Sequence, residues 1–462
     1  MKNVSEKMIK NHKGITLLVL VITIVILIIL STVTISAVFG DGGLIEQSKQ
    51  THSDATNMMY SREENMNKLM QEYSNMMDEE EGIENPNLND IVNPDQNEII
   101  DPGPDPEEPS LPEGWDGDKV EAVESGDGET VPVPIGYTAS KASNENTVIG
   151  GFVIYEGEEE VTDSNVDSAK TSRNQFVWVP VEDISDIANL TSGYDTAGRL
   201  NYQGKLYDFS SSGATEMSSY GQGTERYREP DILTGNDGRD YDNNSSYVNG
   251  ILGLASGNAL KQQLQLGFNE MIESVDTYGG FYIGRYETGN LVATAGTEPV
   301  VVKGNNSISN VNWYYMYRNI KELAANDNVK TTMIWGSLWD RTLIWLAETN
   351  TASSGINGKS YANIVNSSGW GNYNTSSGGT GTRQVSGYSD TWKVNNIYDL
   401  AGNVEEWTLE GRQAYNRVAR AGTSSSSGSN STSTVSGRGN QTIAPDDAYG
   451  VTGTRSVLYV KP

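Results

Sequence analysis

The sequence predicts an α+β fold for its C-terminal part, and three observations support this prediction. From residue 131 to residue 462, apolar segments are short and are separated by Gly, Asn, Ser and Asp, the residues of turns. Four segments have strand character, at residues 151–155, 175–181, 280–286 and 455–460. Two have helical periodicity, at residues 259–274 and 341–348. Since helices and strands do not alternate along the chain, α+β is favoured over a doubly wound parallel sheet.

Composition excludes several classes of function. The chain has 61 acidic and 32 basic residues, a net charge of −29, which argues against nucleic acid as a partner. It has no cysteine, so disulfides, thiolate metal sites and cysteine nucleophiles are excluded. Its two histidines, His12 and His52, both lie near the N-terminus, which excludes imidazole-based triads and zinc clusters.

An uncharged segment near the N-terminus predicts a membrane anchor. Residues 15–38 read ITLLVLVITIVILIILSTVTISAV, which is long enough to cross a hydrocarbon core of ~30 Å. Four lysines precede this run and acidic residues follow it, so we expect a cytoplasmic N-terminus and an extracellular C-terminal domain. The alternative is a secretory signal peptide, whose apolar region is usually only ~7 to 15 residues long.

The leader, residues 1–14, ends in a more specific pattern. Residues 13–18 read KGITLL, with Gly directly before the apolar run. This resembles the prepilin signal of type IV pilins and pseudopilins, and the resemblance implies cleavage between Gly14 and Ile15. The family usually carries Glu five residues into the mature chain, where it helps to register a subunit in the filament, but this chain has Val19. A simple membrane anchor or a minor apical subunit fits that difference.

Two further segments separate the membrane anchor from the C-terminal domain. Residues 39–77 repeat Leu, Ile, Met and Tyr at three- and four-residue steps, a pattern that predicts an amphipathic helix. Residues 78–130 are rich in proline and hold 19 acidic residues and one lysine. Such a segment neither buries apolar surface nor continues a helix, so we expect an extended, self-repelling linker.

Three separated motifs indicate a family. Residues 396–407 read NIYDLAGNVEEW, residues 417–423 read RVARAGT and residues 453–455 read GTR. In order and spacing they resemble the D-x-x-G-N-V-x-E-W motif, the R-V-x-R-G-G-S strand and the terminal G-F-R of the formylglycine-generating enzyme, or sulfatase-modifying-factor, family. The resemblance extends over residues 131–462 and implies a loop-rich C-type lectin-like fold.

The catalytic residues of that family are missing. Its activity depends on two cysteines between the second and third motifs, which hold copper and activate oxygen. The corresponding interval here, residues 424–452, has no cysteine. A serine hydroxyl cannot replace a thiolate as a copper ligand, because its pKa is far higher and its oxygen is a harder donor. We therefore expect no copper and no enzyme activity, and a fold that serves binding instead.

Three functions follow from these patterns. The first is a membrane-anchored binding or adhesion protein displayed outside the cell, with a glycan or a surface protein as ligand. The second is a minor pseudopilin-like subunit of a type IV pilus or secretion filament. The third, a hydrolase using a carboxylate pair such as Asp446 and Asp447, is the weakest, because adjacent acids in a Gly-rich loop are usually turn residues.

The first motif also predicts a calcium site. Asp399 and Glu406 flank a Gly-containing turn whose carbonyls can point inward, giving the hard oxygen ligands that calcium prefers. The resemblance assigns the side chains of Asp399 and Glu406 together with the backbone oxygens of Gly402 and Val404. In the alternative interpretation, Asp399 caps a turn and Glu406 pairs with a nearby arginine.

A polar segment predicts the ligand-binding surface. Residues 424–436 contain eleven Ser, Thr or Asn among thirteen positions. These short side chains lose little rotamer entropy and both donate and accept hydrogen bonds, which suits adaptable recognition. The resemblance places the segment on the substrate face of the enzymes, which mutagenic retroelements diversify in some C-type lectin-like proteins. The predicted ligand-binding residues are Arg412, Tyr415, Ser424, Asn430, Arg438, Asn440, Asp446 and Tyr449. The alternative is a serine-rich loop without a partner.

Overall fold

The computed structural model describes a large part of the C-terminal region. The described residues are 111–217, 227–230, 245–293, 297–307, 311–324, 326–349, 359–374, 379–412, 416–439 and 452–462. The chain divides into two compact units, Met1–Pro102 and Gly103–Pro462, and all described residues belong to the second. The predicted cleavage site at Gly14 and Ile15, the apolar segment 15–38 and the amphipathic segment 39–77 lie outside them. None of the described helices is both long and apolar enough to span a membrane.

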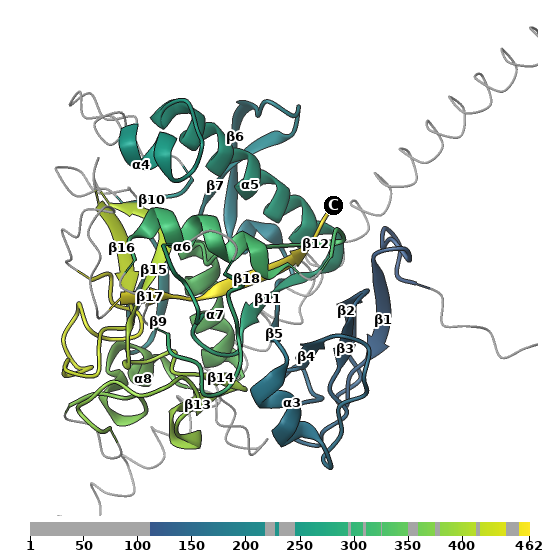
Figure 1. The fold of residues 1–462 in the computed structure, drawn as a ribbon, viewed down its shortest axis with the longest axis vertical. Helices are drawn as coiled ribbons and strands as arrows, with labels where there is room; N and C mark the ends of the chain where they lie inside the picture. Colours follow the sequence, from purple (N-terminus) through teal and green to yellow (C-terminus); the bar gives the residue numbers. More distant parts are fainter. Residues whose placement is uncertain are drawn as a thin grey trace, which may run out of the picture. The chain divides into compact units, whose positions relative to one another are not determined.

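A six-stranded antiparallel sheet forms the centre of this unit (Figure 1). In spatial order its strands are β12 (Val329–Met333), β18 (Ser456–Val460), β11 (Gly280–Gly284), β5 (Gln175–Pro180), β4 (Val153–Glu156) and β3 (Tyr137–Ala139). The four predicted strand segments are confirmed as β4, β5, β11 and β18, with ends that differ by a few residues. Strand β18 pairs with both β12 and β11, so β12 is joined to the rest of the sheet through β18.

Both predicted helices are present, and both are longer than predicted. Helix α5 (Gly257–Tyr278) begins after Ser256, whose side chain accepts the Ala259 N–H, and it ends at Gly279 with a φ of 78°. Helix α7 (Gly336–Glu348) begins five residues before the predicted start. Helix α5 contacts β11 and β18, and α7 contacts β5, so the two helices pack on the central sheet.

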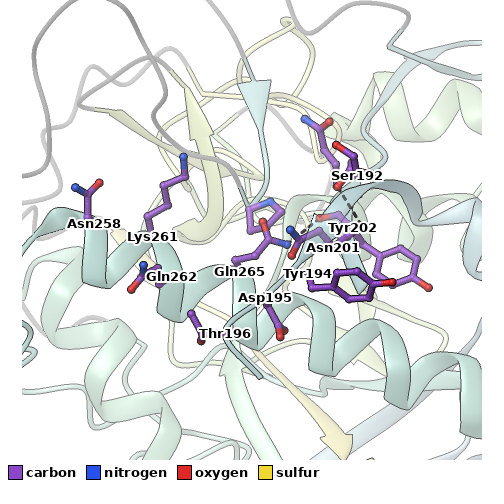
Figure 2. Close-up of a pocket in the computed structure, with 13 residues that line it drawn as sticks. Ser192, Tyr194, Asp195, Thr196, Asn201, Tyr202, Asn258, Lys261, Gln262 and Gln265 are labelled. Atoms are coloured by element: carbon purple, nitrogen blue, oxygen red, sulfur yellow. Dashed lines mark hydrogen bonds between the residues drawn. The ribbon is translucent and has the colours of Figure 1, made fainter. Parts of the chain in front are cut away.

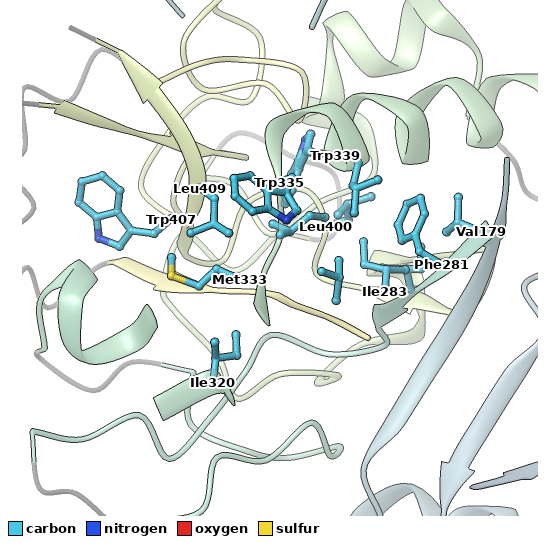
Figure 3. Packing of buried hydrophobic residues seen from close by; sticks show 14 of the residues in the cluster. Val179, Phe281, Ile283, Ile320, Met333, Trp335, Trp339, Leu400, Trp407 and Leu409 are labelled. Atoms are coloured by element: carbon cyan, nitrogen blue, oxygen red, sulfur yellow. The ribbon is translucent and has the colours of Figure 1, made fainter. Parts of the chain in front are cut away.

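The core between these elements is rich in tryptophan (Figure 3). Trp335, Trp339 and Trp407 are at most 1% exposed. The ring of Phe268 on α5 meets Trp335 edge to face, with centroids 5.0 Å apart. Because these rings come from separate segments, they join the helices, the central sheet and the second sheet into one hydrophobic core.

A second sheet brings together parts of all three motifs. Strand β15 (Glu405–Arg412) pairs with β16 (Asn416–Arg420) and β10 (Tyr227–Arg228) in antiparallel fashion, and with β17 (Thr452–Thr454) in parallel. Short hairpins and helices complete the described part. The hairpins are β1–β2 (Val120–Glu124, Thr130–Pro134), β6–β7 (Ala188–Tyr194, Leu200–Gly204), β8–β9 (Tyr207–Ser210, Gly213–Glu216) and β13–β14 (Lys393–Val394, Ile397–Tyr398). The remaining helices are α3 (Val166–Ser172), α4 (Ser245–Gly250), α6 (Trp313–Asn319) and α8 (Tyr361–Val365), with 3₁₀ turns at Ile184–Asp186, Ile320–Leu323, Ser367–Gly369 and Asp390–Trp392.

The mixed helix-and-strand class is therefore confirmed, but the boundary of the linker was predicted too late. Strand β1 lies inside the predicted linker 78–130, and its Val120 is 1% exposed. The Trp115 ring also lies 6.0 Å from Tyr278 of α5. The acidic composition hid this strand because Glu121 and Glu124 are three residues apart and interrupt the two-residue alternation that marks a strand.

Candidate functional site

The first motif is entirely buried, and a buried arginine holds Glu406, the last of its three acids. Arg455 is fully buried, and its Nε and Nη2 lie 2.9 and 2.6 Å from the two carboxylate oxygens of Glu406. The same guanidinium donates to the backbone oxygens of Tyr398 and Gly284, at 3.0 and 2.9 Å. The third motif thus neutralises Glu406 of the first, as the alternative interpretation of Glu406 stated.

The first acid of the motif occupies a tight turn. Asp399 Oδ2 accepts the Gly387 N–H at 2.6 Å and the Ser386 hydroxyl at 3.0 Å. Asp399 Oδ1 is buried without a hydrogen-bond partner in the described part of the chain, and burial raises the pKa of this carboxyl to about 6. Gly402 has a φ of 76°, and a Cβ there would lie 2.4 Å from the Asn372 carbonyl oxygen, so the turn requires glycine.

This arrangement fits the predicted calcium site only in part. Calcium takes six to eight oxygen ligands. Asp399 Oδ1 is a candidate ligand, but both oxygens of Glu406 are engaged by Arg455. The Val404 N–H donates to Glu287, at 3.3 Å. Within the described ranges no group of three or more acidic side chains is arranged to hold a metal ion. The calcium site at Asp399, Gly402, Val404 and Glu406 stays a prediction.

The serine-rich segment is folded over most of its length. Gly428 has a φ of 66° and packs on the Tyr373 ring, and its carbonyl accepts the Ser367 N–H at 2.9 Å. Val435 is fully buried, and its carbonyl accepts the indole N–H of Trp339 at 2.9 Å. These two anchors hold an exposed crest, residues 429–432, above the core.

A side-chain amide organises the crest. Asn430 Oδ1 accepts the backbone N–H groups of Thr432 and Ser433, at 3.2 and 2.9 Å, and both of their hydroxyls. This is the local bonding by which Asn favours turns. The crest therefore has a defined conformation before any ligand arrives.

The crest forms one wall of a pocket of about 600 Å³, which we call the loop pocket. Its other walls come from β8, β10 and α8, which lie far away in the sequence. The residues that line it are Asp208, Phe209, Tyr227, Val365, Ser429, Ser431, Thr432, Thr434, Ser436 and Arg438. The Arg438 guanidinium lies over the Tyr227 ring, 5.4 Å from its centroid.

A buried charge network supports this pocket. Arg438 Nε lies 2.6 Å from Glu410, and its Nη2 lies 2.5 Å from Asp340. Arg420 bridges the same two acids, at 3.0 Å from Asp340 and 2.7 Å from Glu410. Burial opposes ionisation of Glu410, but the two arginines outweigh it and hold the pKa of this carboxyl below its usual range. Because Arg438 Nη1 also donates to the Tyr207 carbonyl at 2.9 Å, all three of its nitrogens are engaged.

A third buried carboxyl lies next to this network. Glu229 is fully buried, and its two oxygens accept the N–H groups of Gly336 and Ser337 at the start of α7, at 2.5 and 2.8 Å. Burial, and then the neighbouring Glu410 charge, raises the pKa of Glu229 to about 8. The two acids therefore differ because Glu410 pairs with two arginines, whereas Glu229 accepts the backbone N–H groups of Gly336 and Ser337.

The structure does not bring all of the predicted ligand-binding residues to one surface. Arg438 lines the loop pocket, whereas Ser424 is only 7% exposed and Asn430 organises the crest. Arg412 ends strand β15, where its backbone pairs with Tyr227. Tyr415, Asn440, Asp446 and Tyr449 lie outside the described residues.

Sequence reasoning missed the opposite wall of the loop pocket. That wall consists of Asp208, Phe209, Tyr227 and Val365, which come from short elements without a motif. No local pattern therefore indicated that these residues would lie beside the serine-rich segment.

Comparison with known proteins does not assign this chain to a family. A scan against protein-family models finds no match to this chain, and a search of curated proteins finds no significant match. The resemblances described above therefore rest on the motifs themselves.

Proposed function

We propose that this protein is a membrane-anchored binding or adhesion protein, displayed outside the cell and without catalytic activity. Its ligand, a glycan or a surface protein, would bind at the crest 429–432 and the loop pocket. The observation that carries this proposal is that the serine-rich segment is a folded wall of a polar pocket. A serine-rich loop without a binding partner would not need to form the wall of a pocket.

The chemistry of the pocket suits recognition of a polar ligand. One wall presents the hydroxyls of Ser429, Ser431 and Thr432, and the opposite wall presents the Asp208 carboxylate and the Tyr227 ring. Hydroxyls donate and accept hydrogen bonds, so they match sugars and backbone amides equally well. Since Asn430 and the buried anchors fix the crest in advance, binding costs little additional ordering.

The N-terminal segments supply the anchor in this proposal. The apolar segment 15–38 would hold the protein in the cell membrane, with the N-terminus in the cytoplasm and the acidic linker outside. The prepilin-like leader would be cleaved after Gly14. Intact-mass measurement of membrane-extracted protein checks this, because the mature chain should begin at Ile15, and retention of Met1 would contradict it.

The outer domain would have a C-type lectin-like fold related to the sulfatase-modifying-factor family. The three motifs support this relationship, and the described mixed fold with a short-stranded antiparallel sheet is compatible with it. Diversification of the serine-rich segment is testable from the genome. A reverse-transcriptase gene and a near-identical template repeat that differs at adenines should lie beside the gene, and their absence would remove diversification without affecting binding.

The second candidate, a minor pseudopilin-like subunit, is favoured by the KGITLL junction alone. Val19, where the family usually has Glu, argues against ordinary filament incorporation. The two functions differ in where the protein is found. Recovery mainly in the membrane fraction supports the binding protein, whereas abundant recovery in sheared pili supports the pseudopilin.

Substitution of the crest tests the binding function. The full chain carrying Ser429→Ala, Ser431→Ala and Thr432→Ala should lose at least about tenfold in affinity for ligands that the unmodified protein binds on a glycan and surface-protein panel. The anchors Gly428 and Val435 are unchanged, so the melting temperature should stay the same. The matched control removes three exposed hydroxyls on α3 or just before it, through Ser164→Ala, Ser168→Ala and Thr171→Ala. Unchanged binding by the crest variant to every ligand would reject the proposal.

A further inference from the structure

A larger pocket, separate from the loop pocket, lies between hairpin β6–β7 and helix α5 (Figure 2). Its volume is about 830 Å³. Figure 2 shows Asn258, Lys261 and Gln262 projecting from α5 on one side, and Tyr194 and Tyr202 on the hairpin side. We call it the hairpin pocket. The two pockets share no lining residue, so they are distinct surfaces of the same domain.

The hairpin is fixed to the helix by a buried amide. Asn269 of α5 is 1% exposed, and its Nδ2 donates to the side chains of Asp195 and Asn201, at 3.0 and 3.1 Å. Its Oδ1 accepts the Tyr202 N–H at 3.0 Å. Gln265, one turn earlier, donates to the Tyr202 carbonyl at 3.0 Å. The walls of the hairpin pocket are therefore held in place by side-chain bonds, although they belong to separate elements.

Two charged residues line the pocket, Asp195 and Lys261, and both already have interaction partners within the protein. Asp195 Oδ1 accepts the N–H groups of Ala197 and Arg199, at 2.8 and 2.9 Å, and its Oδ2 accepts Asn269. Arg199 itself pairs with Glu273 at 2.8 Å, outside the pocket lining. A charged ligand would therefore find little uncompensated charge to pair with.

The groups still open for bonding are neutral. The side-chain amides of Gln203, Asn258 and Gln262 make no hydrogen bond with any residue in the described part of the chain. Asn258 and Gln262 are four residues apart on α5, so they lie on one face, and Gln203 belongs to β7. Each amide offers two donors and one acceptor oxygen. The three amides line one pocket and offer donors and acceptors to a ligand with many hydroxyls.

An exposed aromatic side chain completes the surface. Tyr194, at the end of β6, is 69% exposed, the largest exposure among the large hydrophobic residues of the described part. Such a ring buries a large apolar area when a ligand covers it and keeps a hydroxyl for hydrogen bonding. Tyr202 lies on the same side of the pocket. A sugar ring has an apolar C–H face and an equatorial belt of hydroxyls, and the tyrosines and amides match these two features.

We propose that the hairpin pocket binds a neutral carbohydrate chain, with a sugar ring on Tyr194 and its hydroxyls bonded to Gln203, Asn258 and Gln262. This binding does not rest on the function proposed for the crest. It gives the domain a second contact site of defined ligand class. Two weak sites on one anchored domain raise overall avidity for a polymer or a cell surface without either site being strong.

Titration with neutral oligosaccharides tests this proposal. The probes are maltohexaose, cellohexaose, fully N-acetylated chitohexaose and mannohexaose, added to the full chain in detergent at up to millimolar concentration and measured by calorimetry and saturation-transfer NMR. At least one probe should bind. Tyr194→Ala and Gln262→Ala should each weaken that binding by about tenfold, because each removes a direct contact of an exposed side chain.

Two control variants distinguish the hairpin pocket from the rest of the domain surface. Tyr388→Ala removes a tyrosine that is 58% exposed and does not line the hairpin pocket, and it should leave oligosaccharide binding unchanged. The crest variant should also keep this binding, so failure of one site is distinguishable from failure of the other. The proposal is overturned if no neutral probe binds, if Tyr194→Ala binds as tightly as the unmodified chain, or if only an anionic oligosaccharide such as hexagalacturonate binds.

Discussion

The first motif, residues 396–407, and the serine-rich segment, residues 424–436, were both predicted to contact a ligand, but the structure uses them in opposite ways. Every residue of the first motif is buried, and Glu406, its last acid, is neutralised by Arg455. The serine-rich segment buries Ser424, its two anchors and residues 433–434, but it exposes its crest. The difference teaches that a highly specific sequence pattern can be required for folding. A segment of low complexity can instead form the exposed surface that is available to a ligand.

Physical chemistry explains why the buried segment is the more specific one. A buried charge must be paired, and a turn with positive φ and a close backbone contact must have glycine. Glu406 and Gly402 therefore admit few alternatives. At the crest, Ser431 is exposed to solvent, where many polar side chains would serve equally well for folding.

The largest effect should follow from breaking the pair that neutralises the motif. Arg455→Met leaves Glu406 buried without its partner, and we expect a loss of about 3–5 kcal/mol in the free energy of unfolding, measured by urea denaturation. The control is Arg199→Met, which breaks the surface pair with Glu273 and should cost only about 0–1 kcal/mol. Equal losses in the two variants would show that the buried Arg455–Glu406 pair contributes no more to stability than a surface ion pair does.

The anchor of the serine-rich segment should matter more than its crest. A Cβ at Gly428 would lie 2.6 Å from the Tyr373 ring at a φ of 66°, so Gly428→Ala should cost about 1–3 kcal/mol. Ser431→Ala, in the exposed crest, should change the free energy of unfolding by less than about 0.5 kcal/mol. A loop that tolerates both substitutions equally would not be anchored as described.

Glu229 extends the comparison to a buried acid that has no arginine partner among the described side chains. Its pKa is raised from 4.5 to about 8, so between these pH values the folded state binds a proton that the unfolded state has released. The free energy of unfolding should therefore fall as pH rises through this window, by at most about 1.4 kcal/mol per pH unit. Glu229→Gln should remove this component of the slope in urea denaturation measured at several pH values. An unchanged slope in the variant would contradict the assignment.

The smallest effect should come from calcium. Because Arg455 engages both oxygens of Glu406, adding calcium to chelator-treated protein should change the melting temperature little. Glu406→Ala serves as the matched variant. A calcium-dependent rise in the unmodified protein that disappears in Glu406→Ala would instead establish the predicted site, and would mean that calcium displaces the Arg455 pair.

Local patterns determined the secondary structure where it is strongly periodic. Helices α5 and α7 and four strands of the central sheet were predicted because apolar spacing is a property of a short segment. The hairpins β6–β7 and β8–β9 were not predicted, because their exposed, polar strands lack an apolar face that the sequence would show. Strand β1 was assigned to the linker for a related reason, since its acidic residues dominate the local composition.

The sequence by itself determined the absence of cysteine chemistry, the acidic linker, the uncharged segment 15–38 and the order of the three motifs. Only the tertiary structure decided what those motifs do. Parallel pairing of β15 with β17 places Trp407 beside Thr454, so the next residue, Arg455, reaches Glu406 across 49 positions of the chain. The loop pocket likewise joins Phe209, Tyr227 and Arg438. Such contacts depend on packing between distant segments, and no local pattern encodes which distant residue will fill the space beside a given side chain.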